Sequence, residues 1–248
     1  MRKPRIFQPI DLTASPLTAG ALLQLDDDAA NHVGRVLRMQ VGQALQLFNG
    51  DGNNYDATLV QVDKRQLQVR IDAVISNHNE APVAIHLGQG ISRGERMDFV
   101  LQKSVELGVS AITPLFTERC GVKLAAERLD KKQQQWQKIV IAACEQSGRS
   151  VVPLVHQPQS LSSWLASLPN ALRLTLDPYA ATPLQQHVVA AQRIQLLIGP
   201  EGGLSDSEVR QANAHEFTPV RLGPRVLRTE TAALAALSVI QYQFGDLA

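Results

Sequence analysis

The chain has 248 residues, 44% of them hydrophobic and 19% charged, and a net charge of +1. This length allows one large domain or two, and the composition is that of an ordinary globular protein. No run of eighteen or more apolar residues occurs, and no apolar run follows the basic start of the chain. The sequence therefore predicts neither a membrane span nor a signal peptide, and we expect a cytoplasmic protein.

Cysteine and histidine spacings argue against a metal site. Cys120 and Cys144 are two thiols, which suit no disulfide framework in a reducing compartment. No CxxC, HxxxH or HExxH spacing is present. We expect two structural thiols and no bound metal.

Basic residues gather in two places although the net charge is small. Arg2, Lys3 and Arg5 crowd the start of the chain, and residues 119–149 carry seven Lys or Arg against three acids. Such clusters suit selective contacts with phosphates, and they suit an ordinary solvated face equally well.

The first 75 residues predict a small β-rich unit. Short apolar or alternating runs predict strands at residues 5–7, 22–25, 44–48, 55–62 and 67–71. One helix is expected at about 28–38. Its polar face carries Asn31, Arg35 and Arg38, a stripe that could direct two guanidinium groups at phosphates. A solvated polar face is the alternative, and the basic start of the chain favours RNA.

Residues 76–82 are polar and predict a linker, after which strands and helices alternate. Strands are predicted at 83–87, 111–116, 152–155, 172–176, 194–198 and 220–222. Helices are predicted at 95–107 and 129–146, after Ser160, from Thr182-Pro183, from the capping box Ser205–Glu208, and at 231–244. This alternation predicts an α/β domain with a mainly parallel sheet covered by helices.

The familiar nucleotide motifs are missing. The segment 88–94, GQGISRG, follows a strand, but Arg93 stands where GxGxxG requires its third glycine. Neither GxxxxGK[ST] nor GxSxG occurs. The sequence therefore disfavours nicotinamide enzymes, P-loop enzymes and α/β-hydrolases.

A glycine-rich turn near the C-terminus predicts a ligand loop. The apolar strand at 194–198 runs into Gly199-Pro200-Glu201-Gly202-Gly203, and a capped helix follows. Glycines let the backbone approach a ligand closely, and free N–H groups at a helix start meet polar ligands. A tight strand-to-helix turn is the alternative, but three glycines, a proline and an acid exceed what such a turn needs.

A second turn follows the strand at 220–222. Gly223-Pro224 leads into a loop that carries Arg225, Arg228 and Glu230, and an alanine-rich helix follows. From residue types alone, an exposed ion pair between Arg228 and Glu230 at a helix start is the simpler interpretation.

These two segments, IGPEGGLSDSE at 198–208 and LGPRVLRTETAALAAL at 222–237, resemble the C-terminal motifs of the SPOUT methyltransferases. Within that superfamily the chain resembles the small-subunit ribosomal RNA uridine-N3 methyltransferases (RsmE-like). Further matching motifs follow in order along the chain: PRIFQ at 4–8, HVGRVLRM at 32–39, QKSVELG at 102–108, WQK at 136–138 and EQSGR at 145–149.

The resemblance implies an RNA-binding, PUA-like β-barrel in residues 1–75 and a SPOUT α/β domain with a deep trefoil knot in residues 76–248. It implies S-adenosylmethionine (SAM) as cofactor and a homodimer that completes the site. The positions that match SAM-binding residues are Leu176, Ile198, Gly199, Pro200, Glu201, Gly202, Gly203, Leu222, Gly223, Leu227, Arg228, Thr231 and Ala232.

The implied reaction is methyl transfer to N3 of a uridine in 16S ribosomal RNA, within an assembled or nearly complete small subunit. We expect Arg228 to stabilise charge on the uracil oxygens, and Glu230 to act either as the base or as the partner that orients Arg228. The expected RNA-binding residues are Arg2, Lys3, Arg5, Asn31, Arg35, Arg38 and Arg93.

Two alternatives stay open at this stage. One is another SPOUT activity, methylation of a ribose 2′-oxygen or of purine N1. The other is a non-catalytic RNA-binding protein of ribosome assembly that has kept the fold.

Overall fold

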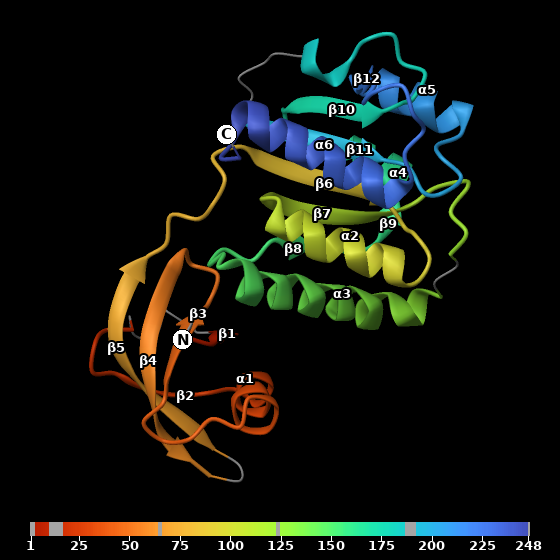
Figure 1. The fold of residues 1–248 in the computed structure, drawn as a ribbon. Helices are drawn as coiled ribbons and strands as arrows, with labels where there is room; N and C mark the ends of the chain where they lie inside the picture. The colour runs from red at the N-terminus through yellow and green to blue at the C-terminus, as the bar shows by residue number, and fades with distance from the viewer. Residues whose placement is uncertain (1–2, 10–16, 64–65, 123–124, 187–191, 248) are drawn as a thin grey trace. The chain divides into compact units, whose positions relative to one another are not determined.

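The computed structural model describes residues 3–9, 17–63, 66–122, 125–186 and 192–247 (Figure 1). It divides the chain into two compact units. The first comprises Met1–Glu80 and Cys144–Val152, and the second comprises Ala81–Ala143 and Pro153–Ala248. Arg2, one of the predicted RNA-binding residues, lies outside the described residues.

The first unit is built on a five-stranded sheet with the order β1-β3-β4-β5-β2. β1 and β3 are parallel, and the other neighbours are antiparallel. The strands are β1 (Arg5–Phe7), β2 (Leu22–Gln24), β3 (Ala44–Phe48), β4 (Asn53–Val62) and β5 (Leu67–Ser76). The predicted strands are therefore present, and β4 and β5 are longer than their apolar runs.

One helix packs on this sheet. α1 (Asp27–Asn31) is capped by Asp26, whose side chain accepts from the backbone N–H of Ala29, and it continues as a π-helical turn, η1 (His32–Val36). Ala29 and Val33 enter the apolar core of the sheet. The predicted helix at 28–38 is thus two residues too long at its end and is not a regular α-helix throughout.

The second unit contains a parallel sheet with the order β12-β10-β11-β6-β7-β8. A short strand, β9 (Gln159–Ser160), also pairs with β7. The strands are β6 (Ala84–Gly90), β7 (Val109–Phe116), β8 (Leu154–Val155), β10 (Leu172–Leu176), β11 (Arg193–Ile198) and β12 (Thr218–Val220). β11 lies inside the sheet and is buried from Ile194 to Ile198, which explains its continuous apolar run.

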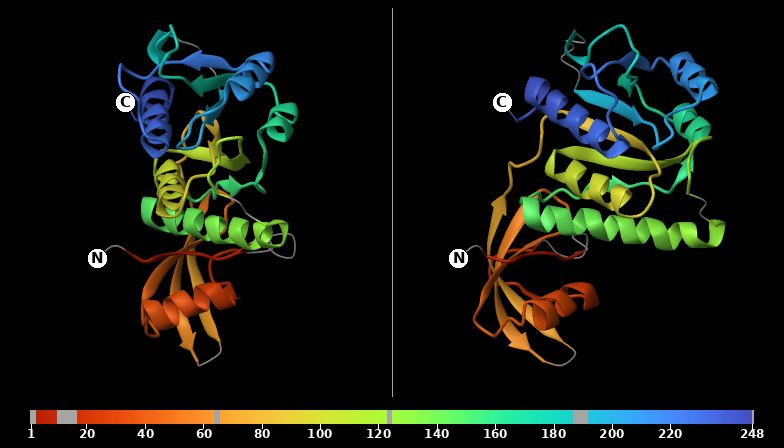
Figure 2. Two further views of the ribbon diagram at one scale, coloured as in Figure 1. Left: turned by 90° about the vertical axis from the view of Figure 1, so that its right-hand side faces the viewer. Right: turned by 45° about the vertical axis from the view of Figure 1, so that its right-hand side comes forward.

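Helices cover both faces of this sheet. α2 and α6 lie side by side on one face, and α4 and α5 lie on the other (Figures 1 and 2). The α-helices are α2 (Glu95–Glu106), α3 (Ala126–Ser147), α4 (Leu161–Ala166), α5 (Asp206–Ala214) and α6 (Thr229–Phe244). No helix in the described ranges is long and apolar enough to cross a lipid bilayer.

Several predicted elements have other bounds in the structure; α3, for example, begins at Ala126 rather than at residue 129. After Thr182-Pro183 the described chain forms only a 3₁₀ turn, η2 (Leu184–Gln186). The strand predicted at 220–222 lies two residues earlier, as β12. The last helix begins at Thr229 rather than 231, because Arg228 is the extended N-cap residue.

Candidate functional site

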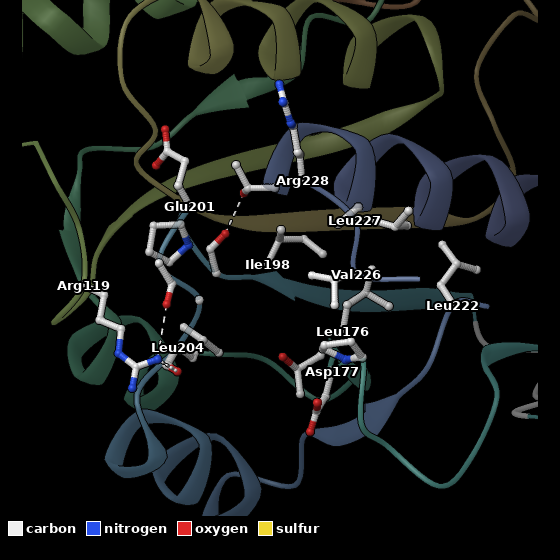
Figure 3. A pocket seen from close by; sticks show the side chains of 18 of the residues that line it. Arg119, Leu176, Asp177, Ile198, Glu201, Leu204, Leu222, Val226, Leu227 and Arg228 are labelled. Carbon is white, nitrogen blue, oxygen red and sulfur yellow. Dashed lines mark hydrogen bonds between the residues drawn. The ribbon is translucent and has the colours of Figure 1, made fainter. Parts of the chain in front are cut away.

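A cavity of about 890 Å³ lies in the second unit, where three parallel strands end (Figure 3). Parallel strands bring their carboxyl ends to one edge of a sheet, and ligands of open α/β folds bind at that edge. The cavity is lined by residues that follow β10, by the turn after β11, and by the loop that joins β12 to α6. Its size is within the range of small-molecule and cofactor sites.

The turn after β11 is compact and depends on its glycines. The N–H of Gly203 donates to the carbonyl of Pro200 at 2.9 Å, and Gly203 has φ +68°, a conformation that side chains disfavour. A Cβ at Gly199 would lie 3.0 Å from the backbone nitrogen of Leu204. The backbone is therefore folded back on itself at the edge of the cavity.

Arg119 binds the carbonyl groups of this turn. Its guanidinium donates to the carbonyl oxygens of Gly202 and Leu204, each at 3.2 Å. A Cβ at Gly202 would lie 3.0 Å from the Cβ of Arg119, so this glycine also permits a close approach. The arginine therefore satisfies two carbonyl groups at this turn.

Glu201 fixes the turn to the segment before α2. Its carboxylate accepts from the backbone N–H of Arg93 at 3.1 Å and from the guanidinium of Arg96 at 3.2 Å. Partial burial raises the pKa of Glu201, but these hydrogen bonds and the charge of Arg96 outweigh it, so the net pKa is lowered. Glu201 is therefore ionised at neutral pH.

The predicted capping box at the start of α5 is confirmed. The Ser205 hydroxyl accepts from the N–H of Glu208, and the Glu208 carboxylate accepts from the N–H of Ser205 at 2.8 Å. The other oxygen of this carboxylate accepts from the N–H of Glu118. The box therefore ends the glycine turn at a defined residue and ties it to the loop after β7.

The loop before α6 closes the opposite side of the cavity. Arg228 is exposed and caps α6 with an extended backbone, and its side chain extends away from Leu176 and Asp177 (Figure 3). The hydroxyl of Thr229 donates to the carbonyl of Gly199 at 2.6 Å. This hydrogen bond joins the two glycine-bearing turns directly.

Glu230 lies in the first turn of α6 and lines the cavity. One oxygen of its carboxylate, Oε2, is buried without a hydrogen-bond partner in the described part of the chain. None of the ion pairs among the described residues joins Glu230 to Arg228. The simple interpretation of an exposed ion pair therefore does not fit this structure.

The structure brings most of the predicted cofactor positions to this one cavity. Those that line it are Leu176, Ile198, Gly199, Pro200, Glu201, Gly202, Gly203, Leu222, Leu227, Arg228 and Ala232. Gly223 and Thr231 are exposed and do not line it. Gly223 instead supplies the turn itself, with φ +72°.

Several lining residues were not predicted from the sequence. Asp177 and Tyr179 directly follow β10, and the rule that ligands bind at strand ends could have found them. The N–H of Tyr179 donates to the Asp177 carboxylate at 2.8 Å. Arg96 and Arg119 come from other elements, and no local signal marks them.

Two of the predicted RNA-binding residues are engaged within the first unit. Lys3 forms an ion pair with Asp56 at 2.7 Å. Arg5 lies over the Phe48 ring, 5.0 Å from its centroid. Its guanidinium donates to Gln46, to Asn54, to the carbonyl of Arg149 and to the hydroxyl of Ser150. These donors hold the unit together.

The other predicted RNA-binding residues that the structure describes are exposed. Asn31, Arg35 and Arg38 belong to α1, η1 and the residues after them. Within the described chain, no hydrogen bond or ion pair engages the guanidinium groups of Arg35 and Arg38. Arg38 has φ +52°, a strained conformation for a residue other than glycine. Arg93 is exposed in the second unit, next to Gly121.

Comparison with known proteins identifies the family to which each unit is similar. Residues 79–241 match a family described as an RNA methyltransferase domain, and residues 25–72 match an RNA methyltransferase PUA domain. The ribosomal RNA small subunit methyltransferase E of Buchnera aphidicola (Schizaphis graminum) is 35% identical over 232 residues, 93% of this chain and 94% of that protein. The protein of the same name from Bacillus subtilis is 31% identical, over 94% and 95%.

Two solved structures are similar over their whole length. A methyltransferase from Legionella pneumophila, in complex with the bound cofactor SAM, superposes with a TM-score of 0.94 at 48% identity, covering 100% of both chains. A ribosomal RNA small subunit methyltransferase E from Neisseria gonorrhoeae, bound to S-adenosyl methionine, gives 0.91 at 39% identity and the same coverage.

A parallel α/β sheet with this cavity, preceded by a PUA-like unit, defines an RNA methyltransferase. The chain belongs to the ribosomal RNA small subunit methyltransferase E family. The resemblance seen in the sequence is thereby confirmed.

Proposed function

We propose that this chain transfers a methyl group from SAM to N3 of a uridine in 16S ribosomal RNA. The observation that carries the proposal is the single cavity shared by the two glycine-bearing turns, in a chain similar over its whole length to SAM-bound methyltransferases. The relatives named ribosomal RNA small subunit methyltransferase E support the choice of RNA.

The residues of the cavity suit SAM. Leu176, Ile198, Leu222 and Leu227 offer an apolar surface for adenine and for the carbons around sulfur. Asp177 offers a carboxylate to the positive charges of SAM. SAM supplies the electrophilic methyl group, and the protein must present the acceptor in line with it.

Uracil N3 is a poor nucleophile until it loses its proton. We assign Glu230 to accept that proton, because it lines the cavity from the first turn of α6. Arg228, exposed beside it, stabilises the negative charge that grows on the uracil oxygens. Glu230 thus serves deprotonation, and Arg228 serves charge stabilisation.

The substrate uridine must be unpaired, because N3 lies on the Watson–Crick edge. We assign RNA binding to a PUA-like domain in residues 1–75, through Arg35 and Arg38 above all, and catalysis to residues 76–248. Closure of the first sheet into a barrel is supported by the Gln8 side chain beyond β1, which accepts from the N–H of Asp26 beyond β2, with β1 and β2 at opposite edges of the sheet.

Three further features belong to this proposal. The chain of the second unit forms a trefoil knot, an arrangement supported by two separate loops that enclose one cavity beside the central strand β11. A homodimer completes the site, as two-fold symmetry is the commonest form of oligomer. The reaction takes place in the cytoplasm, on a small ribosomal subunit that is assembled or nearly so.

The test is incubation of the protein with labelled SAM and small ribosomal subunits from a strain that lacks it. Digestion and mass spectrometry then identify the labelled nucleoside. We expect N3-methyluridine. A label on a ribose 2′-oxygen or on purine N1 would replace the proposed specificity, and calorimetry without saturable SAM binding would indicate a non-catalytic RNA-binding protein.

A further inference from the structure

The end of β6 carries the segment Gly88-Gln89-Gly90, which the sequence presents only as an incomplete GxGxxG motif. Side chains alternate along a strand, so Gly88 and Gly90 share one face and Gln89 points to the other. All three residues are buried. The contacts of Gln89 and Gly90 show that this end of β6 supports the cavity.

On the glycine face, the first turn rests directly on the backbone of β6. A Cβ at Gly90 would lie 2.5 Å from the backbone nitrogen of Pro200 and 2.9 Å from the carbonyl carbon of Gly199. Real Cβ atoms essentially never approach other atoms so closely. The position of the turn therefore requires glycine at this point of the strand.

On the opposite face, Gln89 reaches the second loop. Its amide nitrogen donates to the hydroxyl of Thr229 at 2.9 Å and to the carbonyl of Gly90 at 3.0 Å. The Thr229 hydroxyl in turn donates to the carbonyl of Gly199 at 2.6 Å. Residues from β6, the first turn and the start of α6 are thus joined in one short chain of hydrogen bonds.

The chemistry of these groups determines which of them donates in each hydrogen bond. A hydroxyl has one proton, and the Thr229 proton is used by the Gly199 carbonyl, which can only accept. The Gln89 amide must therefore donate to Thr229, and both of its protons are engaged. Its oxygen is left buried without a hydrogen-bond partner in the described ranges.

We propose that Gln89 and Thr229 are positioning residues of the methyl-transfer site. Thr229 lies between Arg228 and Glu230, so its tether to Gly199 sets both side chains relative to the first turn. Sites bind and react faster when such supports hold their groups in place before the ligand arrives. This inference rests on the proposed function.

The test compares two substitutions at one residue. Thr229→Val removes the hydroxyl and keeps the shape, whereas Thr229→Ser keeps the hydroxyl. We expect Thr229→Val to weaken SAM binding in calorimetry by about tenfold or more, the loss of about one hydrogen bond's free energy or more. It should also lower kcat, with the KM for small ribosomal subunits unchanged, and Thr229→Ser should stay within about threefold of the wild type.

Ser238→Ala is the matched control. Ser238 is on the same helix, and its hydroxyl donates to the carbonyl of Leu234 at 2.9 Å, away from the cavity. We expect this variant to bind SAM like the wild type. If Thr229→Val does not fold, Gln89→Met replaces the amide by an apolar side chain of similar length and should weaken SAM binding in the same direction.

The outcomes separate this inference from the proposed function. A wild-type protein that does not bind SAM refutes the proposed function. A wild-type protein that binds SAM, with a folded Thr229→Val or Gln89→Met variant that binds it equally well, overturns only the positioning role. Equal losses in Thr229→Val and Thr229→Ser would also overturn it, because the hydroxyl would then not matter.

Discussion

Gly90→Ala is the sharpest test of how the cavity is built. The substitution adds one methyl group at the end of β6, where it would meet Pro200 at 2.5 Å, whereas ordinary contact begins near 3.4 Å. The turn must therefore retreat by about 1 Å, since the added Cβ faces backbone atoms rather than a flexible side chain. The carbonyl of Gly199 would move with it, away from the Thr229 hydroxyl.

The expected magnitude has two parts. Overpacking of this kind costs about 1–3 kcal/mol of unfolding free energy. A displacement of about 1 Å among groups that position a reaction costs about 100-fold in rate. We therefore expect kcat to fall by about 100-fold. SAM affinity should fall by about tenfold, or about 1.4 kcal/mol of binding free energy, because the Thr229 hydrogen bond is lost.

Gly88→Ala is the control for the loss of stability. A Cβ at Gly88 would lie 2.4 Å from the indole of Trp164, which is buried in α4 and does not line the cavity. Both substitutions lie on the same face of the same strand, and both should lower the urea midpoint. Calorimetry with SAM distinguishes them, because only Gly90→Ala should weaken binding. Equal SAM affinities for the two folded variants would refute this account of the turn.

Three further predictions concern catalysis, RNA binding and pH. Glu230→Gln should lower kcat by about 10²- to 10⁴-fold while SAM and RNA still bind. A variant that reacts at the wild-type rate in a single-turnover assay would show that Glu230 has no catalytic role. Replacing Arg35 and Arg38 together by Ala should weaken RNA binding and reduce the slope of log K against log salt by about 1.4–1.8, with SAM binding unchanged; an unaltered RNA affinity in filter binding would contradict their role. Burial, with a contribution from the charge of His156, lowers the pKa of His86 from 6.5 to about 4. As the pH falls, this imidazole is therefore protonated in the unfolded chain before it is protonated in the folded protein. The free energy of unfolding should decrease by up to about 3 kcal/mol as the pH drops from 6.5 towards 4. Urea titrations should show a smaller decrease for His86→Gln.

Local sequence signals were enough to predict the helices and strands that surround the site. The Ser205–Glu208 capping box forms as predicted, and Ser160 caps α4 by accepting from the N–H of Ser163. Alternation and apolar runs located the strands that carry the cavity, to within two residues for β12. Caps and periodicity act over a few residues, so a sequence shows them directly.

Signals that depend on context were less reliable. Thr182-Pro183 has the residue types of a helix start, but the described chain continues only as one 3₁₀ turn. Arg5 looked like an RNA ligand, but its guanidinium is engaged by Asn54, Gln46 and groups near Arg149. Residue type shows what a side chain can bind, and the fold decides which partners reach it first.

The sequence by itself determined the family, the alternation of strands and helices, and the two glycine-bearing turns. Only the tertiary structure decided why Gly88 and Gly90 are glycines, because the reason is the approach of Trp164 and Pro200. It also decided that Gln89 meets Thr229, 140 positions further along the chain. That pairing follows from the sheet order, which places β6 beside β11, and sheet order depends on how all the apolar faces pack together rather than on any short stretch of sequence.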